Sequence, residues 1–583
     1  MELTGARIVI ECLKEQGVDT VFGYPGGTIL NIYDELYKNS DSIRHILTAH
    51  EQGATHAADG YSRSSGKVGV VLATSGPGAT NLVTGIATAY MDSVPIVAIT
   101  CNVASSLLGK DSFQEVDITG ITMSITKHNY IVRRVEDIAN VMREAFAIAK
   151  SGRPGPVLID IPKELTAAKA EFEPMNLFSI DSTVLAKDTV QGEKRSKAMR
   201  ITKVNQASDK EIEAAAKLVS EAKRPFLYVG GGVINADACR QVKQLAEKCH
   251  IPVAVSLMGK SAFPAEHELA CGMIGMHGTF AANKAANECD LLIAVGARFS
   301  DRVISDASKF AKNSKILHID IDPAEINKNI RSYHFVVGSI QEILLRLLPL
   351  VKEHDATDWN EKVAEWKKKI PPMYTKKLKL HPKFIFETIH DMLDKDTILT
   401  TEVGQHQMWT AQFYPFSRPR TFITSGGLGT MGFGTGAAIG SQVANPDKYV
   451  VHIAGDGSFR MNCNELATIS YYNLPIIIIV VNNGTLGMVR QWQKLFYDGR
   501  FSQTTLDRGP DFVKLAEAYG IRGYRAETEK EFADVFAKAI EKTADGIRKP
   551  ALIDTVINID EMVMPMVPAG KPIDELLLEA GEK

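Results

Sequence analysis

Short apolar runs alternate with helix-like segments in three successive stretches of the chain, and this rhythm constrains the fold more than any other feature. The runs are VDTVFGYP, VGVVLATSGPG, VPIVAIT and GPVLIDIP in the first stretch, RPFLYVGGGV, IPVAVSLMG, DLLIAVGAR and SKILHIDID in the second, and TILTTEVG, YVVHIAGDG, PIIIIVVNN and KPALIDTVI in the third. Apolar strands separated by helices are typical of parallel sheets covered on both faces. The sequence therefore predicts an α/β protein with three doubly wound parallel-sheet domains.

Two polar stretches separate these blocks, DSTVLAKDTVQGEKRSKAMRITKVNQ and KEHDATDWNEKVAEWKKKIPP. The first lacks core periodicity and the second is highly charged, so we predict that both are linkers. The predicted divisions are a first domain (1–178), a linker (179–207), a middle domain (208–350), a second linker (351–379), a third domain (380–560) and a C-terminal segment (561–583). Ligands of open parallel sheets bind at the carboxyl ends of the strands, so the candidate sites are expected there.

Charge and cysteine usage exclude several classes of protein. The formal net charge of the 583 residues is −3, which gives no electrostatic reason to expect nucleic acid or an anionic membrane as partner. Seven cysteines without a CxxC pair or zinc-site spacing fit a reducing compartment. The start, MELTGARIVIECLKEQG, does not resemble a secretory signal, and the longest apolar run, LPIIIIVV, is too short to span a bilayer. We expect a cytoplasmic protein.

Polar residues follow two of the apolar runs in the third block. Asp456 lies between two glycines after YVVHIAG, and Asn482 and Asn483 follow PIIIIVV. Adjacent parallel strands would bring these groups together, and carboxylate and amide oxygens are suited to Mg²⁺ beside a diphosphate. A helix expected to begin near Phe459 would direct its positive end at the same place. GDG alone is more often a turn with a capping aspartate; the asparagines at the second strand end favour a metal–diphosphate site.

GDG followed by NN at this spacing is typical of thiamine-diphosphate enzymes, and the whole chain resembles the catalytic subunit of the biosynthetic acetohydroxyacid synthase (acetolactate synthase) family. The resemblance rests on FGYPGGTILNIYDELY, HEQGATHAADGYSR, ATSGPGATN, GKDSFQE, SITKHNY, GRPGPVLIDIPK, GMIGMHGT, ARFSDRV, HIDIDPAEINKN, VGQHQMWTAQFY, SGGLGTMGFG, GDGSFRMN, LGMVRQW and PMVPAGK. It implies that the three domains bind, in order, the pyrimidine of thiamine diphosphate, FAD, and the diphosphate with Mg²⁺. It also implies that residues 561–583 form a lid.

The resemblance implies a carboligase. Such an enzyme decarboxylates pyruvate and joins the two-carbon unit to a second pyruvate, giving 2-acetolactate, or to 2-oxobutyrate, giving 2-aceto-2-hydroxybutyrate, in branched-chain amino acid biosynthesis. The cofactors would be thiamine diphosphate, Mg²⁺ and FAD, the last without redox turnover. The partners would be 2-oxo acids, a second or further copies of the chain in a homodimer or tetramer with active sites at the subunit interface, and possibly a regulatory small subunit.

The catalytic residues implied by the resemblance are Glu51, Gln114 and Gly27. Glu51 would hydrogen-bond the pyrimidine N1′ and so favour the imino group that deprotonates the cofactor, acting on cofactor held by another subunit. Gln114 and the main chain of Gly27 would face negative charge developing on the substrate oxygen. Without the resemblance, Glu51 would be interpreted as a solvated helix residue.

The resemblance implies three groups of cofactor-binding residues. Mg²⁺ would be bound by Asp456, Asn483 and the main-chain carbonyl of Thr485. Thiamine diphosphate would contact Gly404, Gln405, His406, Gly429, Met431, Gly457, Ser458, Met461, Leu486, Gly487 and Met488. FAD would contact Arg200, Gly231, Leu257, Gly275, Met276, His277, Gly278, Gly296, Arg298, Asp320 and Ile321. On their own these glycines would be ordinary strand-end turns, and the methionines would be core residues.

Substrate choice would depend on Arg302, Trp492 and Phe113. An arginine fork suits the carboxylate of a second 2-oxo acid, and an indole wall favours an additional methyl group. Taken alone, Arg302 would be a salt-bridging surface residue.

The sequence departs from the family at Ala104, Ser105 and Ser106, where a proline and two arginines are common, and at Thr28, where alanine is usual. Two positive charges are therefore missing near the expected substrate channel. The alternatives are a catabolic acetolactate synthase, a pyruvate oxidase or another thiamine-dependent carboligase. A non-catalytic cofactor-binding subunit is a further alternative, which the presence of Glu51, Asp456 and Asn483 argues against.

Overall fold

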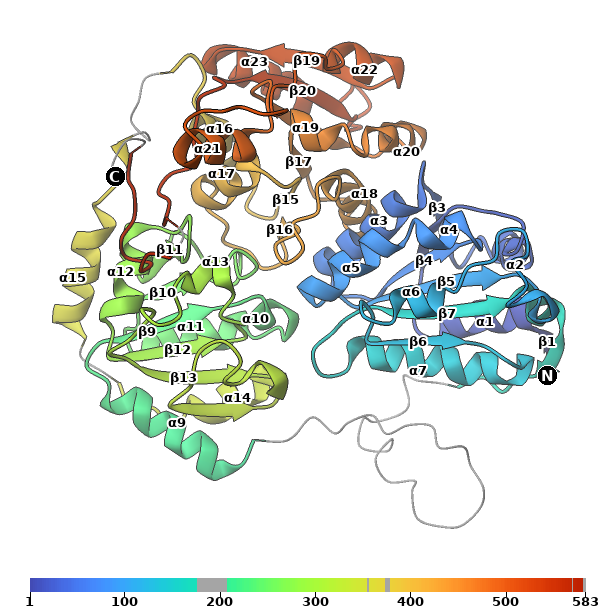
Figure 1. The fold of residues 1–583 in the computed structure, drawn as a ribbon, viewed down its shortest axis with the longest axis horizontal. Coiled ribbons are helices and arrows are strands. Elements are labelled where there is room, and N and C mark those ends of the chain that lie inside the picture. The colour runs from blue at the N-terminus through green and yellow to red at the C-terminus, as the bar shows by residue number, and fades with distance from the viewer. Residues whose placement is uncertain (176–206, 354–355, 373–377, 569, 580–583) are drawn as a thin grey trace. The chain divides into compact units, whose positions relative to one another are not determined.

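The computed structural model describes residues 1–175, 207–353, 356–372, 378–568 and 570–579, so Arg200 and nearly all of the predicted first linker lie outside the described residues. The chain divides into two compact units (Figure 1). The first comprises residues 1–203, 427–445 and 464–472, and the second comprises 204–426, 446–463 and 473–583. In the described parts of the chain, no helix combines the length and apolar character needed to cross a bilayer.

The first unit is built on a six-stranded sheet whose strands all pair in parallel. Its strand order is β3 (Arg44–Leu47), β2 (Thr20–Gly23), β4 (Gly69–Ala73), β5 (Ile96–Asn102), β7 (Val157–Pro162), β6 (His128–Ile131). A short antiparallel pair joins β1 (Glu2–Thr4) to β8 (Lys169–Glu171). The helices are α1 (Gly5–Glu15), α2 (Leu30–Lys38), α3 (Glu51–Ser65), α4 (Pro77–Thr80), α5 (Val83–Asp92), α6 (Ile118–Thr122), α7 (Ile138–Lys150), α8 (Lys163–Ala167), α18 (Gly434–Ala444) and α20 (Leu466–Tyr471).

The second unit contains two further six-stranded parallel sheets. The middle sheet has the order β11 (Ala270–Met273), β10 (Val253–Val255), β9 (Pro225–Val229), β12 (Leu291–Val295), β13 (Lys315–Asp320), β14 (His334–Val337). The third sheet has the order β16 (Phe422–Ile423), β15 (Ile398–Thr401), β17 (Val450–Gly455), β18 (Ile476–Asn482), β20 (Ala551–Val556), β19 (Arg522–Ala526).

The helices of the second unit connect these strands, as the colour gradient of Figure 1 shows. They are α9 (Asp209–Glu221), α10 (Gly232–Asn235), α11 (Cys239–Lys248), α12 (Phe280–Glu288), α13 (Asp301–Ile304), α14 (Ile340–Leu347), α15 (Thr357–Lys367), α16 (Pro382–Met392), α17 (Gln405–Phe413), α19 (Asp456–Phe459), α21 (Gly487–Phe496), α22 (Phe512–Ala518) and α23 (Glu529–Ile540). Reciprocal capping fixes two of the starts, with Ser208 and Glu211 at α9 and Thr528 and Glu531 at α23.

Alternate residues of the middle-sheet strands enter two different cores. Leu227 and Val229 of β9 pack in a core that contains residues of α9, α11 and α14, whereas Phe226 and Tyr228 pack in one that contains residues of α12 and α15. Because successive side chains of a strand point to opposite faces, helices cover both faces of this sheet. Together with the parallel pairing in all three sheets, this confirms the predicted α/β fold class.

The strand order of each sheet reverses beside a central strand. The reversal lies between β2 and β4 in the first sheet, between β9 and β12 in the middle sheet, and between β15 and β17 in the third. The crevice outside the carboxyl ends of strands at such a switch point is where open α/β sheets bind ligands. The topology therefore marks one candidate ligand-binding edge on each sheet.

Helices α3 and α18 pack against each other through glycines within the first unit. A Cβ added at Gly60 would overlap the main chain of Ala437, and one added at Gly440 would overlap that of Ala57. Only glycine lets two backbones approach this closely. These glycines therefore hold α18, which belongs to the third block of the sequence, tightly against a helix of the first block.

Candidate active site

The register of the third sheet places the GDG and NN segments side by side. β17 and β18 are parallel neighbours in which Gly455 lies opposite Val481. Asp456 therefore leaves β17 where β18 reaches Asn482, as the sequence predicted. The expected helix beginning near Phe459 is wrong, because α19 begins at Asp456 and ends at Phe459 after a single turn. An acidic residue is favourable in a first helical turn, which accounts for the earlier start.

Asp456 is a buried carboxylate with one unsatisfied oxygen. Its side chain is almost completely inaccessible, and its Oδ2 atom has no hydrogen-bond partner among the described residues. Burial raises the pKa of Asp456 to about 6, against the opposing effect of Arg460. A buried unpaired carboxylate oxygen is unfavourable until something binds it. A metal ion would satisfy this atom.

A chain of two side-chain amides, Gln405 and Gln491, holds Asn483 in one orientation. Asn483 Nδ2 donates to Gln405 Oε1 at 3.0 Å, and Gln405 Nε2 donates to Gln491 Oε1 at 3.0 Å and to the carbonyl of Glu561 at 2.9 Å. Asn483 Oδ1 accepts from the main-chain N–H of Thr485 at 3.3 Å. The described residues contain no group of three or more His, Cys, Asp or Glu side chains suited to a metal. An ion beside Asp456 therefore needs amide and main-chain oxygens as further ligands.

His406 lies at the start of α17, against the end of β17. A Cβ added at Gly455 would lie 2.7 Å from His406 Nδ1, so glycine gives the ring its space. Burial lowers the pKa of His406 to about 3, which keeps the imidazole neutral. Its Nε2 atom has no partner within the described ranges. A neutral ring with one unsatisfied nitrogen fits a phosphate oxygen as hydrogen-bond acceptor.

The other residues predicted to contact thiamine diphosphate in the second unit fall into two groups. Around Asp456 and Asn483 the structure gathers Gly404, Gln405, His406, Gly457, Ser458, Leu486 and Gly487. Two contacts show this closeness: a Cβ at Gly457 would lie 2.6 Å from Leu486 Cδ2, and one at Gly487 would lie 2.6 Å from Asn483 Nδ2. Met488 packs on the third-sheet core, while Met461 is 57% exposed.

Glu51 is the first residue of α3 and is half-buried. Its Oε2 atom accepts a hydrogen bond from Asn81 Nδ2 at 2.9 Å. A Cβ added at Gly78 would lie 3.3 Å from Glu51 Oε1. The carboxyl group is therefore oriented by one amide and approached closely by the loop after β4.

The loops after β2 and β4 meet at the switch point of the first sheet. A Cβ added at Gly26 would lie 2.5 Å from Thr74, and one added at Gly76 would lie 3.0 Å from the Gln114 backbone, which has a positive φ of 61°. Gly27 is exposed, with open space at its Cβ position. Gly27 lies in the loop after β2, and Gln114, in the connection after β5, approaches the loop after β4 at the same edge of the sheet. Both residues are predicted to face the substrate oxygen.

Thr28 is buried and hydrogen-bonded, whereas Phe113 is exposed. Thr28 Oγ1 donates to the Cys101 carbonyl at 2.7 Å and accepts from the Ser75 N–H at 3.1 Å, so the hydroxyl that replaces the usual alanine is fully used. Phe113 is 88% exposed in the isolated chain. The structure thus gives Phe113 no pocket of its own.

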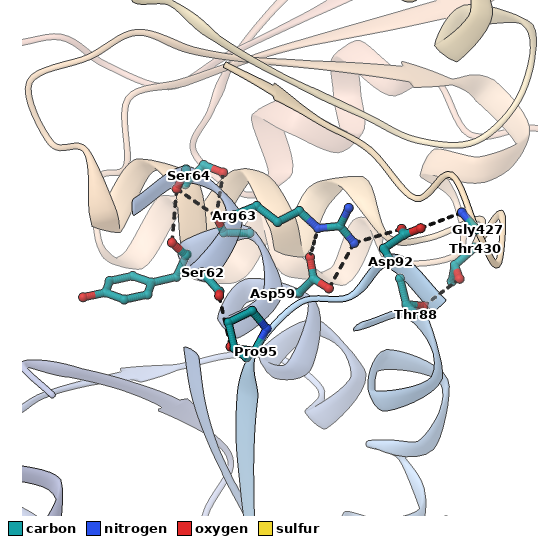
Figure 2. Close-up of polar contacts among 12 residues, drawn as sticks. Asp59, Ser62, Arg63, Ser64, Thr88, Asp92, Pro95, Gly427 and Thr430 are labelled. Carbon is teal, nitrogen blue, oxygen red and sulfur yellow. Dashed lines mark hydrogen bonds and ion pairs between the residues drawn. The ribbon is translucent and has the colours of Figure 1, made fainter. Parts of the chain in front are cut away.

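Gly429 and Met431 belong to the first unit, together with Glu51. Figure 2 shows how their loop is held: Asp92 Oδ1 accepts from the Gly427 N–H at 2.7 Å, and the hydroxyls of Thr88 and Thr430 are 2.7 Å apart. The other carboxylate oxygen of Asp92 accepts from Arg63 at 3.0 Å. A buried charge network on α3 and α5 therefore anchors the loop that contains Met431.

The predicted FAD residues lie at the carboxyl ends of five neighbouring strands of the middle sheet. Gly231 follows β9, Leu257 follows β10, Gly275 to Gly278 follow β11, Gly296 and Arg298 follow β12, Asp320 ends β13 and Ile321 follows it. At the switch point a Cβ on Gly230 would overlap the Gly296 carbonyl. Such close glycine loops let a backbone approach a nucleotide.

Lys260, in the loop after β10, is a buried cation at this same edge. Its side chain is 6% exposed, and its ammonium group makes no hydrogen bond or ion pair with the described residues. Ser261 beside it has a positive φ of 73°, and its buried Oγ also has no partner in the described part of the chain. A phosphate group would satisfy both.

Replacing Lys260 by methionine is expected to raise the thermal midpoint of the flavin-free protein at pH 7. Burial lowers the pKa of Lys260 from 10.5 to about 8, so a charged amine there opposes folding by on the order of 3 kcal/mol at most. Between pH 8 and 10.5 the unfolded chain binds more protons, so wild-type stability rises and the difference shrinks. Circular dichroism melts at pH 7 and pH 10 check this, with exposed Lys217→Met as control. Equal midpoints at pH 7 contradict it.

Comparison with known proteins identifies the family. The chain matches the models of the thiamine pyrophosphate enzyme N-terminal TPP binding domain over residues 3–121, the central domain over 212–347 and the C-terminal TPP binding domain over 402–555. The probable acetolactate synthase large subunit of Methanocaldococcus jannaschii is 47% identical over 97% of this chain and 94% of its own. The acetolactate synthase of Mycobacterium leprae is 46% identical over 100% and 91%, and the acetolactate synthase large subunit of Buchnera aphidicola is 43% identical over 100% and 99%. The chain belongs to the acetolactate synthase family.

Two residues expected to select substrates in the acetolactate synthase family, Arg302 and Trp492, are linked through a methionine cluster: Arg302 contacts Met276, and Met276 and Trp492 pack against the same cluster. Arg302 Nη1 lies 3.8 Å from Met276 Sδ, and the Arg302 side chain is 65% exposed beside Asp301. Trp492 and Met276 both pack against Met562, Met564 and Met566 of the C-terminal segment. The structure thus places an exposed guanidinium group near an apolar wall.

Several residues around the sites were not foreseen from the sequence. Asn81 binds Glu51, Gln491 completes the amide chain from Asn483, and Glu465 binds the backbone just before Glu51. Asn81 lies in the ATSGPGATN segment and Gln491 lies in LGMVRQW. Both segments carry the family resemblance, which is the signal that could have identified these two residues. Nothing local to Glu465 distinguishes it from any other glutamate at a helix start.

Proposed function

We propose that this chain is the catalytic subunit of a biosynthetic acetolactate synthase. It decarboxylates pyruvate and joins the two-carbon unit to a second pyruvate, giving 2-acetolactate, or to 2-oxobutyrate, giving 2-aceto-2-hydroxybutyrate. The observation that carries the proposal is the unpaired, buried oxygen of Asp456 beside Asn483, at the switch point of a sheet in a thiamine pyrophosphate enzyme. Full-length similarity to acetolactate synthases from bacteria and an archaeon supports the choice of reaction.

The residues of the third sheet fit Mg²⁺ and a diphosphate. Asp456 Oδ2 and His406 Nε2 are two buried atoms without a hydrogen-bond partner among the described residues, and the first suits a cation while the second suits a phosphate oxygen. Asp456, Asn483 and the carbonyl of Thr485 would hold the ion, with the main chain of Gly457 and Ser458 beside the diphosphate. Gln405 would keep Asn483 in the orientation that this requires.

Bound thiamine diphosphate would supply the nucleophilic carbon and the electron sink for decarboxylation. Glu51 would hold an acidic proton on its carboxyl group for the pyrimidine N1′, with Asn81 orienting Oε2. The amide of Gln114 and the N–H of Gly27 would stabilise negative charge on the substrate oxygen. Met431 would lie against the pyrimidine.

FAD would bind at the carboxyl edge of the middle sheet. The close glycine loops at Gly230 and Gly296, together with the unpartnered Lys260 and Ser261, fit a nucleotide with phosphate groups. No side chain at this edge is assigned a redox role. We propose that FAD is structural and that the predicted division into pyrimidine-binding, FAD-binding and diphosphate-binding domains follows the three sheets.

Arg302 and Trp492 would select the acceptor. The exposed guanidinium group of Arg302 would bind the acceptor carboxylate, and Trp492 would contact its alkyl group. Trp492→Leu is expected to lower the preference for 2-oxobutyrate over pyruvate by about 10-fold or more, because one methylene is worth about 1–3 kcal/mol. The ratio of products formed from mixed 2-oxo acids measures this, with Phe335→Leu at an exposed position of β14 as control. An unchanged ratio contradicts the assignment of Trp492.

We further propose a homodimer or tetramer with active sites between subunits, small-molecule 2-oxo acids as substrates and a possible regulatory small subunit. All seven cysteines are unpaired, which supports a reducing compartment such as the cytoplasm. Residues 561–567 bind Gln405, Gln491 and the Met276–His277 loop, which supports a role for the C-terminal segment as a cover of the site.

Product identification tests the proposed function. The protein is incubated with pyruvate, Mg²⁺ and thiamine diphosphate, with and without FAD and 2-oxobutyrate. We expect 2-acetolactate from pyruvate alone and 2-aceto-2-hydroxybutyrate when 2-oxobutyrate is added. Rapid flavin reduction by pyruvate would indicate a pyruvate oxidase, and full activity without any flavin binding would indicate a catabolic synthase. Cofactor binding without CO2 release would indicate a non-catalytic subunit.

A further inference from the structure

The connection from β3 to α3, residues Thr48 to His50, leads directly to Glu51 and is held by side chains from a distant part of the first unit. The N–H of Leu47 donates to Tyr472 Oη at 2.9 Å. The N–H of Ala49 donates to Glu465 Oε2 at 3.1 Å, and that of His50 donates to Glu465 Oε1 at 3.1 Å. The segment Asn464–Tyr472 thus binds the last residue of β3 and two residues of the connection.

Glu465 is built into the start of α3. Its side chain is fully buried, and Thr468 Oγ1 donates to its Oε2 atom at 2.6 Å. A Cβ at Gly53 would overlap Glu465 Oε1, so glycine in the first turn of α3 lets the carboxylate lie against the helix. The free N–H groups and positive end of a helix favour a negative charge there.

Both oxygens of Glu465 accept hydrogen bonds from main-chain N–H groups, and this sets a strict chemical requirement. An amide side chain of the same size would turn its NH2 group toward one of these donors, leaving a buried main-chain N–H without an acceptor. The connection would then relax, and the first residue of α3 would move with it.

We propose that Glu465 is a positioning residue that fixes the main chain at the start of α3 and thereby places the carboxyl group of Glu51. The inference rests on the proposed role of Glu51. Displacement of a proton-donating group by about 1 Å is enough to cost roughly 100-fold in rate. Asn81 orients the tip of the Glu51 side chain, and Glu465 sets where that side chain begins.

Steady-state kinetics of Glu465→Gln test the proposal. We expect kcat for pyruvate decarboxylation to fall about 10- to 100-fold, with little change in the dissociation constant of Mg²⁺–thiamine diphosphate, because the residues assigned to bind it are not altered. The matched control is Glu211→Gln, the same change in the exposed cap of α9, which is expected to leave kcat unchanged. Loss of cofactor affinity without loss of kcat would overturn the proposal.

A double-mutant cycle separates positioning from general destabilisation. If Glu465 acts through Glu51, Glu465→Gln has almost no further effect on kcat once Glu51 is glutamine. Multiplicative losses overturn the proposal. If Glu51→Gln alone leaves turnover intact, the proposed role of Glu51 is wrong. This outcome differs from multiplicative losses, which would contradict only the positioning role of Glu465.

If Glu465→Gln does not fold, a milder variant, Tyr472→Phe, tests whether the 464–472 segment positions the start of α3. Tyr472→Phe removes the hydroxyl that accepts from the Leu47 N–H and donates to the His45 carbonyl at 3.5 Å, and we expect a smaller loss of kcat, about 3- to 10-fold. Hydrogen exchange of peptides covering residues 45–53 is expected to quicken in the same variant. Unchanged exchange and unchanged kcat would both contradict the assigned role of this segment.

Discussion

Replacing Glu51 by glutamine is expected to lower the rate of CO2 release from pyruvate by about 100-fold or more. Glutamine has the same shape and can keep the contact with Asn81, but it has no acidic proton to give the pyrimidine N1′. General acid–base groups contribute about 10²- to 10⁴-fold. The initial rate at saturating Mg²⁺, thiamine diphosphate and pyruvate measures the effect.

The control for this change is Glu164→Gln, an exposed glutamate of the same unit that binds the Ser105 N–H. It is expected to retain the wild-type rate. Thermal midpoint and cofactor affinity of Glu51→Gln are expected to match the wild type, because Glu51 is half-buried and forms no ion pair with the described residues. Unchanged turnover in Glu51→Gln would refute the assigned role of this residue.

Asp456→Asn is expected to weaken binding of Mg²⁺–thiamine diphosphate by about 100-fold or more, with a parallel loss of activity at ordinary cofactor concentrations. A neutral amide cannot balance the charge of the ion. The same change is expected to raise the thermal midpoint of the cofactor-free protein, because burial of the Asp456 carboxylate is unfavourable and raises its pKa. Opposite signs of these two effects are the signature of a binding residue.

Titration of the cofactor against protein fluorescence, in the presence of a fixed Mg²⁺ concentration, gives the affinity. Asp560→Asn is the matched control, because the Asp560 side chain is 52% exposed and pairs with Arg490 and Lys494 in the same unit. We expect it to bind the cofactor normally. Wild-type affinity in Asp456→Asn would contradict the assignment of Asp456 as a metal ligand.

The sequence was a good guide where local pattern decides the structure. The apolar runs predicted three parallel sheets because buried strands need apolar residues on both faces. Asp456 and Asn483 could be placed together in advance because each follows a strand directly and the two strands are neighbours. The helix after Asp456 was misplaced because a glycine-rich segment gives little helical periodicity by which to find a start.

Sequence patterns could not predict contacts between residues that are distant in the chain. Glu465 binds Ala49 and His50, which lie 416 and 415 residues earlier in the chain, and no periodicity relates such distant positions. The same holds for α18, which packs on α3 through Gly60 and Gly440 although its sequence lies in the third block. Arg200 remains a prediction, because it lies outside the described residues.

We propose that Glu51 of one subunit and the Asp456 site of another serve the same cofactor molecule. Hybrid dimers test this most directly: Glu51→Gln and Asp456→Asn chains with different affinity tags are produced together, and the dimers that contain one of each are isolated. Each parent homodimer is inactive under the assay conditions. If the sites are shared, one of the two sites in the hybrid has both native residues, and about half of the wild-type activity is expected. A hybrid as inactive as its parents would show that the two residues do not serve one shared site.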